Sequence, residues 1–369
     1  MTRLGDVCAI RYGKDHKKLS DGSIPAYGSG GIIRYVDTAI CEQPSVLIPR
    51  KGTLGNLFYT DEPFWTVDTL FWTDIDQTKI VPKYLYYQLK QKDLASYNVG
   101  TAVPSLTVEV LNEIDLDVPS IDKQRRIVEV LNSFDSKIAL NNQLNDYLAN
   151  LLDAAFANSA KSGSKEFGLP EVVDILSGGT PKTKNAEYWE DGRIPFFTPG
   201  DVTNSVYTLT TEKHITDVGL DNCNSELYPV DTVFLTARGT VGKVAIAGRP
   251  MAMNQSCFAF RGKSIPQSVV FQIIKNAVKT LRAKANGATF AAINTRDLKI
   301  ETVAVPCNKE IAHYDESASK WLDLIRTNEE ENLQLSALRD ILLPKLMSGE
   351  IDVSKVDLTQ LTNNHLADC

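Results

Sequence analysis

This sequence contains few of the residues from which metal sites and disulfide frameworks are built. Its 369 residues include only 4 histidines and 6 cysteines. The histidines show neither HExxH nor HxxxH spacing, so a hydrolytic metal site would lack ligands. The cysteines form no CxxC pair, which indicates reduced thiols rather than a zinc site or a disulfide framework. We therefore predict no metal site on this chain.

Long apolar segments are also missing. The first residues, "MTRLGDVCAIRYGK", have no uninterrupted apolar core. No apolar run in the sequence approaches the roughly 18 residues that a membrane-spanning helix needs. Neither a signal peptide nor a membrane span is indicated, and a cytoplasmic location is expected.

Familiar catalytic motifs are missing as well. The glycine loop "RGTVGK" at 238–243 lacks the GxxxxGK[ST] pattern of a Walker loop. The sequence has no GxSxG elbow and no N/D-P-P-F/Y/W stretch of the kind found in adenine methyltransferases. We therefore predict no catalytic residue, no bound cofactor and no enzyme activity for the isolated chain.

Positive charge is in short supply. The chain has 39 lysines and arginines against 46 aspartates and glutamates, for a net charge of -7. This balance argues against non-specific coating of nucleic acid, because that binding grows with the number of phosphates neutralised. A DNA-binding protein of this composition would have to concentrate its basic residues on one face. The length allows two domains, each with its own core.

One unit of the sequence occurs twice. An offset of 187 residues aligns Gly52 with Gly239 and Gly55 with Gly242. The same offset brings "LDVPS" onto "VAVPC", where alternating apolar residues before the proline predict a strand. Upstream, an offset of 170 residues brings "IPAYGSGG" onto "IPFFTPGD". A repeat of this length indicates a duplicated domain rather than a solenoid.

A long helix is predicted after each repeat, at 121–159 and 308–346. Apolar residues in the first helix recur with the 4,3 spacing of a coiled-coil seam. Asparagines interrupt the seam at equivalent places in both helices, namely Asn141, Asn145, Asn328 and Asn332. If the helices pack antiparallel, we expect Asn141 to meet Asn328 close to a pseudo-twofold axis and to fix the register. Alternatively, the asparagines are solvated residues at the edge of an amphipathic helix.

The second helix contains two residues that do not suit a helix seam. Arg339 interrupts the seam, and we expect Leu338 to take its place after a small rotation. Pro344 is expected to end the helix, because proline cannot donate to the preceding turn. The polar segment "VDLTQLTNNHLADC" that closes the sequence is expected to be frayed. A helix of about 37 residues is roughly 55 Å long, which is enough to hold two domains at a fixed distance.

Two polar loops are candidates for contact with an anion. Lys51 and Arg238 each precede a Gly-Thr-x-Gly turn, where backbone N–H groups can approach a phosphate. The alternative is a β-hairpin turn with an exposed base. The second candidate, the segment 176–202, begins with a Gly-Gly pair that is expected to be flexible. It provides hydroxyls and lysines suited to phosphate oxygens, at Thr180, Lys182, Thr183 and Lys184.

Two aromatic residues of the same segment, Tyr188 and Trp189, allow two interpretations. They could stack on bases, but we expect them to belong to the core of their domain.

The motifs of the second copy are "LSGGTPKT", "YW", "IPFFTPGDV", "RGTVGKVAI", "MNQSCFAF", "NGATFAAINTRDL" and "LLPKLMSGEI". In this order they resemble the specificity subunit of type I restriction-modification systems, and the resemblance covers nearly the whole chain. The first copy matches more loosely: it retains "KGTLGN", "FWTVDTLFW", "VGTAVPSLT" and "VPSIDKQRRIV" but lacks the "GGTPKT" entry.

The resemblance implies an α+β fold with two similar α/β target recognition domains and two long antiparallel helices between them. Its parts would be a first recognition domain, a first spacer helix, a second recognition domain, a second spacer helix and a C-terminal tail, at 1–120, 121–159, 160–307, 308–346 and 347–369. Each domain would read one half of a split site in double-stranded DNA. The helices would set the spacing and dock methyltransferase subunits, which are joined by restriction and translocase subunits. Those partners, and not this chain, would bind S-adenosylmethionine, ATP and Mg²⁺.

Carried over residue by residue, the resemblance implies DNA contacts from polar residues of both copies. In the first copy they are Lys14, Tyr27, Ser29, Lys51, Thr53, Asn56 and Thr101. In the second copy they are Lys182, Thr183, Lys184, Thr198, Asp201, Arg238, Thr240, Lys243 and Thr289. Two other functions remain open: a tandem binding module for a glycan or a protein, and a catalytic protein whose site forms only between the domains. Activity of the isolated chain towards DNA or S-adenosylmethionine would favour the second.

Overall fold

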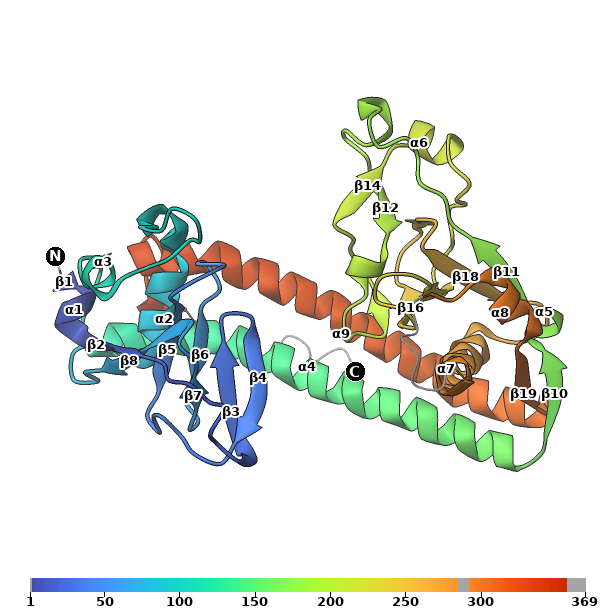
Figure 1. Ribbon diagram of the computed structural model, residues 1–369, viewed down its shortest axis with the longest axis horizontal. Helices are drawn as coiled ribbons and strands as arrows, with labels where there is room; N and C mark the ends of the chain where they lie inside the picture. The colour runs from blue at the N-terminus through green and yellow to red at the C-terminus, as the bar shows by residue number, and fades with distance from the viewer. Residues whose placement is uncertain (1, 285–291, 357–369) are drawn as a thin grey trace. The chain divides into compact units, whose positions relative to one another are not determined.

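The computed structural model describes residues 2–284 and 292–356, and it confirms the predicted α+β class (Figure 1). The chain divides into two compact units, which are treated separately below. The first unit draws on Met1–Ser136 and Leu335–Cys369, and the second is Lys137–Gln334. In the described part of the chain, no helix has both the length and the apolar content needed to cross a membrane.

The first unit is built on a four-stranded antiparallel sheet with the order β2-β8-β5-β6. Its strands are β2 (Cys8–Tyr12), β5 (Ser45–Pro49), β6 (Phe58–Thr60) and β8 (Leu70–Ile75). Every residue of β5 is buried, as its continuous apolar sequence predicts for a strand covered on both faces. Val46 and Ile48 face the main core with helix α2 (Pro82–Lys90), whereas Leu47 faces a smaller cluster with Phe64.

Smaller elements complete the first unit. A three-stranded sheet has the order β4-β3-β7, with β3 (Asp21–Gly28), β4 (Gly31–Val36) and β7 (Trp65–Thr66). The short elements are β1 (Thr2–Arg3) paired with β9 (Asp115–Leu116), the helices α1 (Leu4–Val7) and α3 (Val108–Asn112), and the 3₁₀ turns η1 (Leu94–Tyr97) and η4 (Val353–Lys355).

The second unit repeats this arrangement and adds a strand. Its main sheet has the order β11-β18-β15-β16-β13, formed by β11 (Val173–Ser177), β13 (Tyr207–Thr208), β15 (Val233–Thr236), β16 (Val244–Ala247) and β18 (Cys257–Gly262). The smaller sheet, β14-β12-β17, is formed by β12 (Ile194–Phe197), β14 (Lys213–Ile215) and β17 (Ala252–Met253). The remaining elements are the strand pair β10 (Ser164–Gly168) and β19 (Thr302–Pro306), the helices α5 (Leu169–Val172), α6 (Asp217–Asp221), α7 (Gln267–Lys284) and α8 (Thr295–Ile300), and the turns η2 (Ala186–Tyr188) and η3 (Pro199–Asp201).

The structure confirms the duplication that the sequence predicted. Strands β8 and β18 begin and end 187 residues apart. The same offset relates both ends of the two long helices, α4 (Ile121–Lys161) and α9 (Asn308–Ser348), which are 41 residues long each. The predicted spans 121–159 and 308–346 lie within them.

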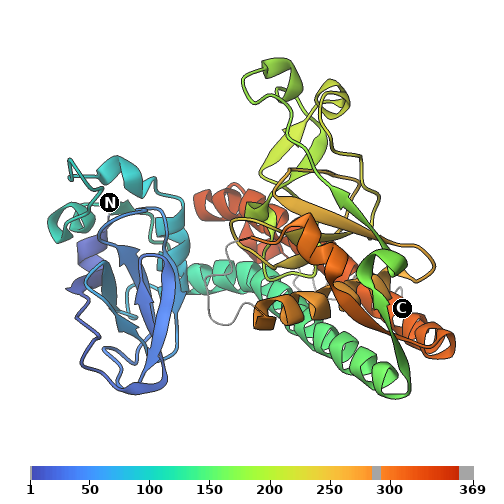
Figure 2. The same ribbon diagram turned by 45° about the vertical axis from the view of Figure 1, so that its right-hand side comes forward.

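Helices α4 and α9 run antiparallel, side by side (Figures 1 and 2). Their predicted seam is largely buried. In the first unit, Ile127 and Phe134 of α4 are buried in the main core. In the second unit, Leu152 of α4 and Ile325 of α9 are buried in the main core. Both helices therefore contribute side chains to the core of each unit.

Helix α9 continues through Pro344, contrary to our expectation that it ends there. Leu343, Leu346 and Met347 are buried in the core of the first unit. Burying each such side chain contributes about 1.5–3 kcal/mol, which together exceeds the roughly 3 kcal/mol cost of proline inside a helix. The helix ends instead before Gly349, whose φ of +78° is the left-handed conformation common after a helix.

One other expectation for this end of the chain needs correction. Leu338 does not replace Arg339 in the seam: it is 42% exposed, and Arg339 stays in place by pairing with Asp135 of α4. Within the segment 347–369, Val353 is buried in the core of the first unit. Of the segment that was expected to be frayed, 356–369, residues 357–369 lie outside the described residues.

Candidate functional site

The Gly-Thr-Val-Gly turn of the second unit connects β15 to β16 and carries two exposed bases. Gly239 and Gly242 have φ angles of +77° and +80°, a conformation that favours glycine because it has no Cβ. Arg238 and Lys243 flank the turn, and both are exposed. The turn is thus a β-hairpin, and its two bases remain available to an anion.

A second loop packs against this hairpin. The Thr240 hydroxyl donates to the carbonyl of Pro199 at 3.0 Å, and the Lys243 ammonium donates to the carbonyl of Val202 at 3.4 Å. The structure therefore brings the hairpin together with the loop that contains Thr198 and Asp201, although 41 residues separate them in the sequence.

Asp201 holds that second loop in shape. Its Oδ2 accepts hydrogen bonds from the backbone N–H and the hydroxyl of Thr198, both at 2.7 Å. Its Oδ1 accepts from the backbone N–H of Glu212 at 2.8 Å. Both carboxylate oxygens are therefore engaged within the protein, which suits a positioning role better than a direct contact with a base.

The lysine-rich segment of the second unit is exposed but anchored at one end. Lys182, Thr183 and Lys184 are exposed, and the carbonyl of Lys182 accepts a hydrogen bond from the indole N–H of Trp189 at 3.3 Å. The Trp189 ring packs edge-on against Phe196 with 5.3 Å between centroids. Trp189 therefore packs within the unit, as expected.

The Gly-Gly pair that precedes this segment is close-packed, and our expectation of a flexible entry was wrong. A Cβ at Gly178 would overlap the carbonyls of Met253 and Asn254, and one at Gly179 would overlap the backbone of Asn224. Glycine is required here because two backbone segments approach closely. The Thr180 hydroxyl donates a hydrogen bond to the side-chain oxygen of Gln255.

Arg282 is a basic residue of this site that the sequence did not point to. It lies on α7, and its guanidinium donates to the carbonyl of Val241 in the hairpin turn at 2.8 Å. It adds a third base beside Arg238 and Lys243. Neither a motif nor the repeat indicates it, because the equivalent residue of the first copy is Ala95.

The equivalent turn of the first unit has a similar arrangement. Gly52 has a φ of +93°, and Lys51 and Thr53 are exposed. The side-chain amide of Asn56 donates to the carbonyl of Ser29 at 2.7 Å. The structure therefore brings Ser29, Lys51, Thr53 and Asn56 together.

A neighbouring loop of the first unit carries Thr101, which is exposed. The loop is shaped by Asn98, whose side-chain oxygen accepts from the backbone N–H groups of Gly100 and Ser105, both at 2.8 Å. Ser105 forms an isolated β-bridge with Lys51, which places this loop beside the turn.

Three further residues, Lys14, Tyr27 and Thr289, were also predicted to contact DNA. Lys14 is exposed, and its carbonyl accepts from the indole N–H of Trp65 at 2.9 Å. Tyr27 is half-buried against Phe58, and burial raises the pKa of its phenol. Its ring serves packing at least in part. Thr289 lies outside the described residues.

The seam asparagines are paired across α4 and α9, but in a different register from the one we expected. Asn141 donates to the side-chain oxygen of Asn332 at 2.9 Å, and Asn328 donates to that of Asn145 at 2.8 Å. The two contacts are equivalent under the 187-residue offset, so the local symmetry holds one helical turn away from the predicted Asn141 and Asn328 pair. Three of the four asparagines are buried, which contradicts the interpretation as solvated edge residues.

Titratable groups at these sites offer little for catalysis or metal binding. Among the described residues, no three of His, Cys, Asp or Glu are grouped as metal ligands. The thiols of Cys8 and Cys257 are buried, and burial raises the pKa of Cys8 to about 12. The chemistry that the exposed loops present is that of bases, hydroxyls and amides.

The sequence matches the protein family described as the type I restriction modification DNA specificity domain, over residues 1–150 and 161–334. A specificity subunit of the type I restriction enzyme MjaIX from Methanocaldococcus jannaschii is 30% identical over 172 residues, which cover 44% of this chain and 39% of the relative. The specificity subunit of the HindI enzyme from Haemophilus influenzae is 22% identical over 396 residues, covering 82% of this chain and 85% of the relative.

A solved structure has a similar fold. It is the S subunit of a type I restriction-modification system from M. genitalium, with a TM-score of 0.58 at 17% identity, and the alignment covers 94% of this chain and 95% of that one. The similarity extends over both units and both long helices.

Proposed function

This chain belongs to the type I restriction-modification DNA specificity family, and from that premise we propose that it selects the target sequence for a type I enzyme. Each unit reads one half of a bipartite site in double-stranded DNA, and α4 and α9 set the distance between the halves. The duplication is the main support for this proposal. One domain occurs twice, and the two copies are connected by helices α4 and α9, whose first residues, like their last residues, are also 187 positions apart. Two copies of a DNA-binding domain held at a fixed distance are expected to bind two half-sites separated by a fixed spacer.

In the second unit, the hairpin turn and its neighbours supply the phosphate contacts. Arg238, Lys243 and Arg282 are basic residues at one turn, and they concentrate positive charge on a chain of net charge -7. Hydroxyls and lysines of the second unit add contacts to phosphate oxygens, namely from Lys182, Thr183, Lys184, Thr198 and Thr240, with Thr289 retained from the sequence. Asp201 acts by positioning Thr198.

In the first unit, the equivalent turn takes the same role with fewer bases. Lys51 supplies the charge, and the neighbouring polar groups are Ser29, Thr53, Asn56 and Thr101. Lys14 and Tyr27 would contact DNA at the periphery. The weaker basic character predicts a smaller electrostatic contribution from this unit to DNA affinity.

The long helices also provide a surface for a methyltransferase subunit. On α4, Leu140, Leu144 and Tyr147 recur at helical spacing on one exposed face. Exposed apolar residues grouped on one face are typical of a protein contact. The assembled enzyme would also contain restriction and translocase subunits and would act in the cytoplasm. S-adenosylmethionine, ATP and Mg²⁺ would bind to those partners.

The decisive experiment expresses the chain with its neighbouring methyltransferase in a host that lacks adenine methylation and maps N6-methyladenine across the genome. We expect a split motif only when both proteins are present. If no motif appears although a complex forms, the chain is a binding module for another ligand, such as a glycan or a protein. Methylation by either protein alone would also contradict the proposal.

Arg238→Ala tests the hairpin within the same system. Loss of one phosphate contact should weaken binding to the target by roughly tenfold and reduce the slope of affinity against salt by about 1. Arg249→Ala is the matched control, because Arg249 is an exposed arginine beyond the other end of β16. Unchanged methylation and unchanged salt dependence in Arg238→Ala would remove this residue from the site.

A further inference from the structure

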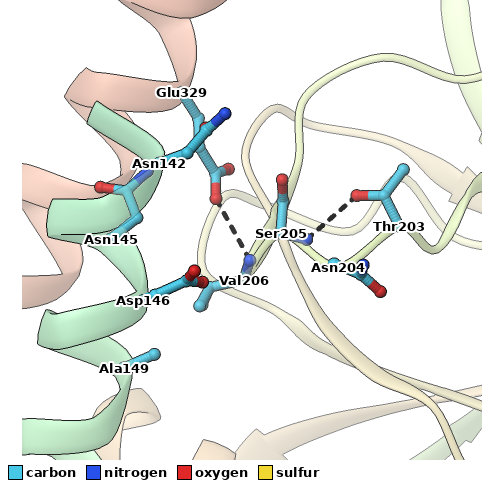
Figure 3. Close-up of a pocket in the computed structure, with 9 residues that line it drawn as sticks. All are labelled: Asn142, Asn145, Asp146, Ala149, Thr203, Asn204, Ser205, Val206 and Glu329. Carbon is cyan, nitrogen blue, oxygen red and sulfur yellow. Dashed lines mark hydrogen bonds between the residues drawn. The ribbon is translucent and has the colours of Figure 1, made fainter. Parts of the chain in front are cut away.

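A polar pocket of about 410 Å³ lies inside the second unit between α4, α9 and the segment 203–206 (Figure 3). Two carboxylates line it, Glu329 from α9 and Asp146 from α4. Figure 3 shows both side chains directed towards the segment 203–206. Of the nine described residues that line the pocket, none is basic. Negative charge here is therefore not balanced by the pocket itself.

Glu329 is buried, and one of its two carboxylate oxygens lacks a well-formed hydrogen bond. The side chain is only 7% exposed. Its Oε1 accepts a hydrogen bond from the backbone N–H of Val206 at 3.1 Å. The backbone of Tyr207 also interacts with the carboxylate, but Oε2 is buried without a well-formed hydrogen bond in the described structure. A buried polar atom left unpaired is costly, so a carboxylate that lines a pocket and has such an oxygen points to a missing ligand. That ligand must carry positive charge or donate a proton.

The other polar groups that line the pocket indicate which kind of cation it could bind. Thr203 and Ser205 offer hydroxyl oxygens and Asn204 offers an amide oxygen, so every available donor atom is a hard oxygen. Oxygen donors select Mg²⁺ and Ca²⁺ over softer metals, and Mg²⁺ in particular binds through one or two carboxylates and keeps several waters. A volume of about 410 Å³ has room for an ion with such a water shell, since each water occupies about 30 Å³.

The internal repeat shows that the fold does not require this pair of charges. At the 187-residue offset, Glu329 corresponds to Asn142 and Asp146 corresponds to Leu333. Both carboxylates therefore occur in one copy only, although the helices that carry them are otherwise equivalent. A purely structural role in the helix pair would be served by the neutral residues of the other copy.

We propose that this pocket binds a divalent cation of the Mg²⁺ and Ca²⁺ class, with Glu329 and Asp146 as its charged ligands. The bound ion would link three elements of the second unit: α4, α9 and the segment that follows the Thr198–Asp201 loop. This inference is independent of the DNA target, because it concerns the isolated chain.

The test is metal binding by the purified full chain after chelator treatment, well above pH 7. Calorimetric titration with MgCl₂ or CaCl₂ alone should show one site, and either metal should raise the melting temperature. Glu329→Gln and Asp146→Asn should each weaken binding by roughly tenfold or more. Glu329→Gln keeps an oxygen for the Val206 N–H, so folding should be retained. Glu330→Gln is the matched control, because it removes a charge from the adjacent residue outside the pocket lining.

Crystals soaked in MnCl₂ give a second readout that needs no variant, since the anomalous signal should lie between Glu329 and Asp146. Absence of metal binding by the wild-type chain would overturn the proposal. Equal binding by wild type and Glu329→Gln, or an equal loss in Glu330→Gln, would also overturn it. Stabilisation by methylguanidinium but by neither metal would overturn it in favour of a basic side chain as the occupant.

Discussion

The guanidinium of Arg339 donates to Oδ1 of Asp135 at 2.7 Å, joining α9 to α4 within the first unit. The other carboxylate oxygen accepts from the hydroxyl of Tyr87 at 2.8 Å, and the ammonium of Lys83 lies 3.5 Å away. At the 187-residue offset, Asp135 and Arg339 correspond to Leu322 and Leu152, which are both buried in the core of the second unit. One copy thus uses an ion pair where the other uses an apolar pair.

This equivalence predicts the effect of exchanging the two kinds of pair. Arg339→Leu alone should lower the free energy of unfolding by on the order of 2 kcal/mol, because it leaves a half-buried carboxylate without its main partner. Adding Asp135→Leu recreates the apolar pair of the second unit and should recover most of the loss. Urea unfolding of wild type, both single variants and the double variant measures the coupling, and a coupling energy near zero would contradict the prediction.

The same pair has a defined dependence on pH. Burial alone would raise the pKa of Asp135, but the hydrogen bonds from Arg339 and Tyr87 outweigh it and lower the pKa below its ordinary value of 3.8. The contribution of the ionised carboxylate is therefore complete at neutral pH and is lost only as the pH falls through the lower pKa of the folded state. The stability difference between wild type and Arg339→Leu should stay constant from about pH 5 to about pH 8 and shrink in stronger acid.

The asparagine contacts predict a second pattern of stability changes. Asn328→Leu should destabilise the chain by about 1–3 kcal/mol, because it leaves the side-chain oxygen of Asn145 buried without a donor. The double variant Asn145→Leu with Asn328→Leu leaves no unpaired group and should be more stable than the sum of the single losses predicts. Asn142→Ala is the control: Asn142 accepts a hydrogen bond from Asn332 at 2.9 Å, but this contact is exposed, so its loss should cost less than about 1 kcal/mol. Equal losses for Asn142→Ala and Asn328→Leu would refute a special role for the buried pair.

The repeat and the helix seams could be predicted because they depend on residue spacing, which the sequence shows directly. Strands β8 and β18 and both long helices follow the 187-residue offset that Gly52 and Gly239 defined, whereas the strands near the start of each copy do not. The pairing of the asparagines could not be predicted, since one helical turn of slip changes the partners without changing the seam. Pro344 and Arg339 were misjudged for a related reason: their local penalties are offset by distant contacts, namely the buried end of α9 and the carboxylate of Asp135.

The candidate site also contains some residues that the sequence could predict and others that only the fold reveals. Arg238, Thr240 and Lys243 lie in one motif, and the sequence pointed to all three. Arg282 reaches the same turn from α7, a contact that only the fold creates. The role of Asp201 also depends on the fold, because its partner Glu212 lies on another segment.

The exposed face of α4 allows a test of the methyltransferase docking proposed above. At the 187-residue offset, Leu140, Leu144 and Tyr147 correspond to the polar residues Thr327, Glu331 and Gln334, so this apolar face belongs to α4 alone. Leu140→Ser combined with Tyr147→Ser should weaken assembly with the methyltransferase by roughly tenfold or more, as expected for residues at the centre of an interface.

Co-purification and analytical ultracentrifugation measure that assembly. Leu324→Ser is the matched control, since Leu324 is an exposed leucine on α9. DNA binding by the free variant chain should be unchanged, because the face is apolar and lacks a base for phosphate. Normal assembly of the double variant would place the docking surface elsewhere.

Glu329 predicts how the second unit responds to pH. Burial raises the pKa of its carboxyl from about 4.5 to about 7, against the opposing effect of backbone hydrogen bonds. A raised pKa means that the folded chain retains a proton which the unfolded chain has already released. The stabilising contribution of this group is therefore complete below about pH 4.5 and is lost as the pH rises to about 7. Glu329→Gln removes the titration and should flatten this part of the profile.

Over that range, wild type should lose on the order of 3 kcal/mol relative to Glu329→Gln, since each pH unit between the two pKa values is worth about 1.4 kcal/mol. Urea unfolding of both proteins from about pH 4 to about pH 8, with a chelator present, measures the difference. Asp146 is the other acid of the pocket, and the difference should persist in an Asp146→Asn background because burial of Glu329 is its main cause. A difference that does not change with pH would show that the Glu329 carboxyl is hydrated in solution. If it does change, a divalent cation added at about pH 8 should restore the lost stability to wild type and have a much smaller effect on Glu329→Gln, which lacks the ionised carboxylate and binds the metal more weakly.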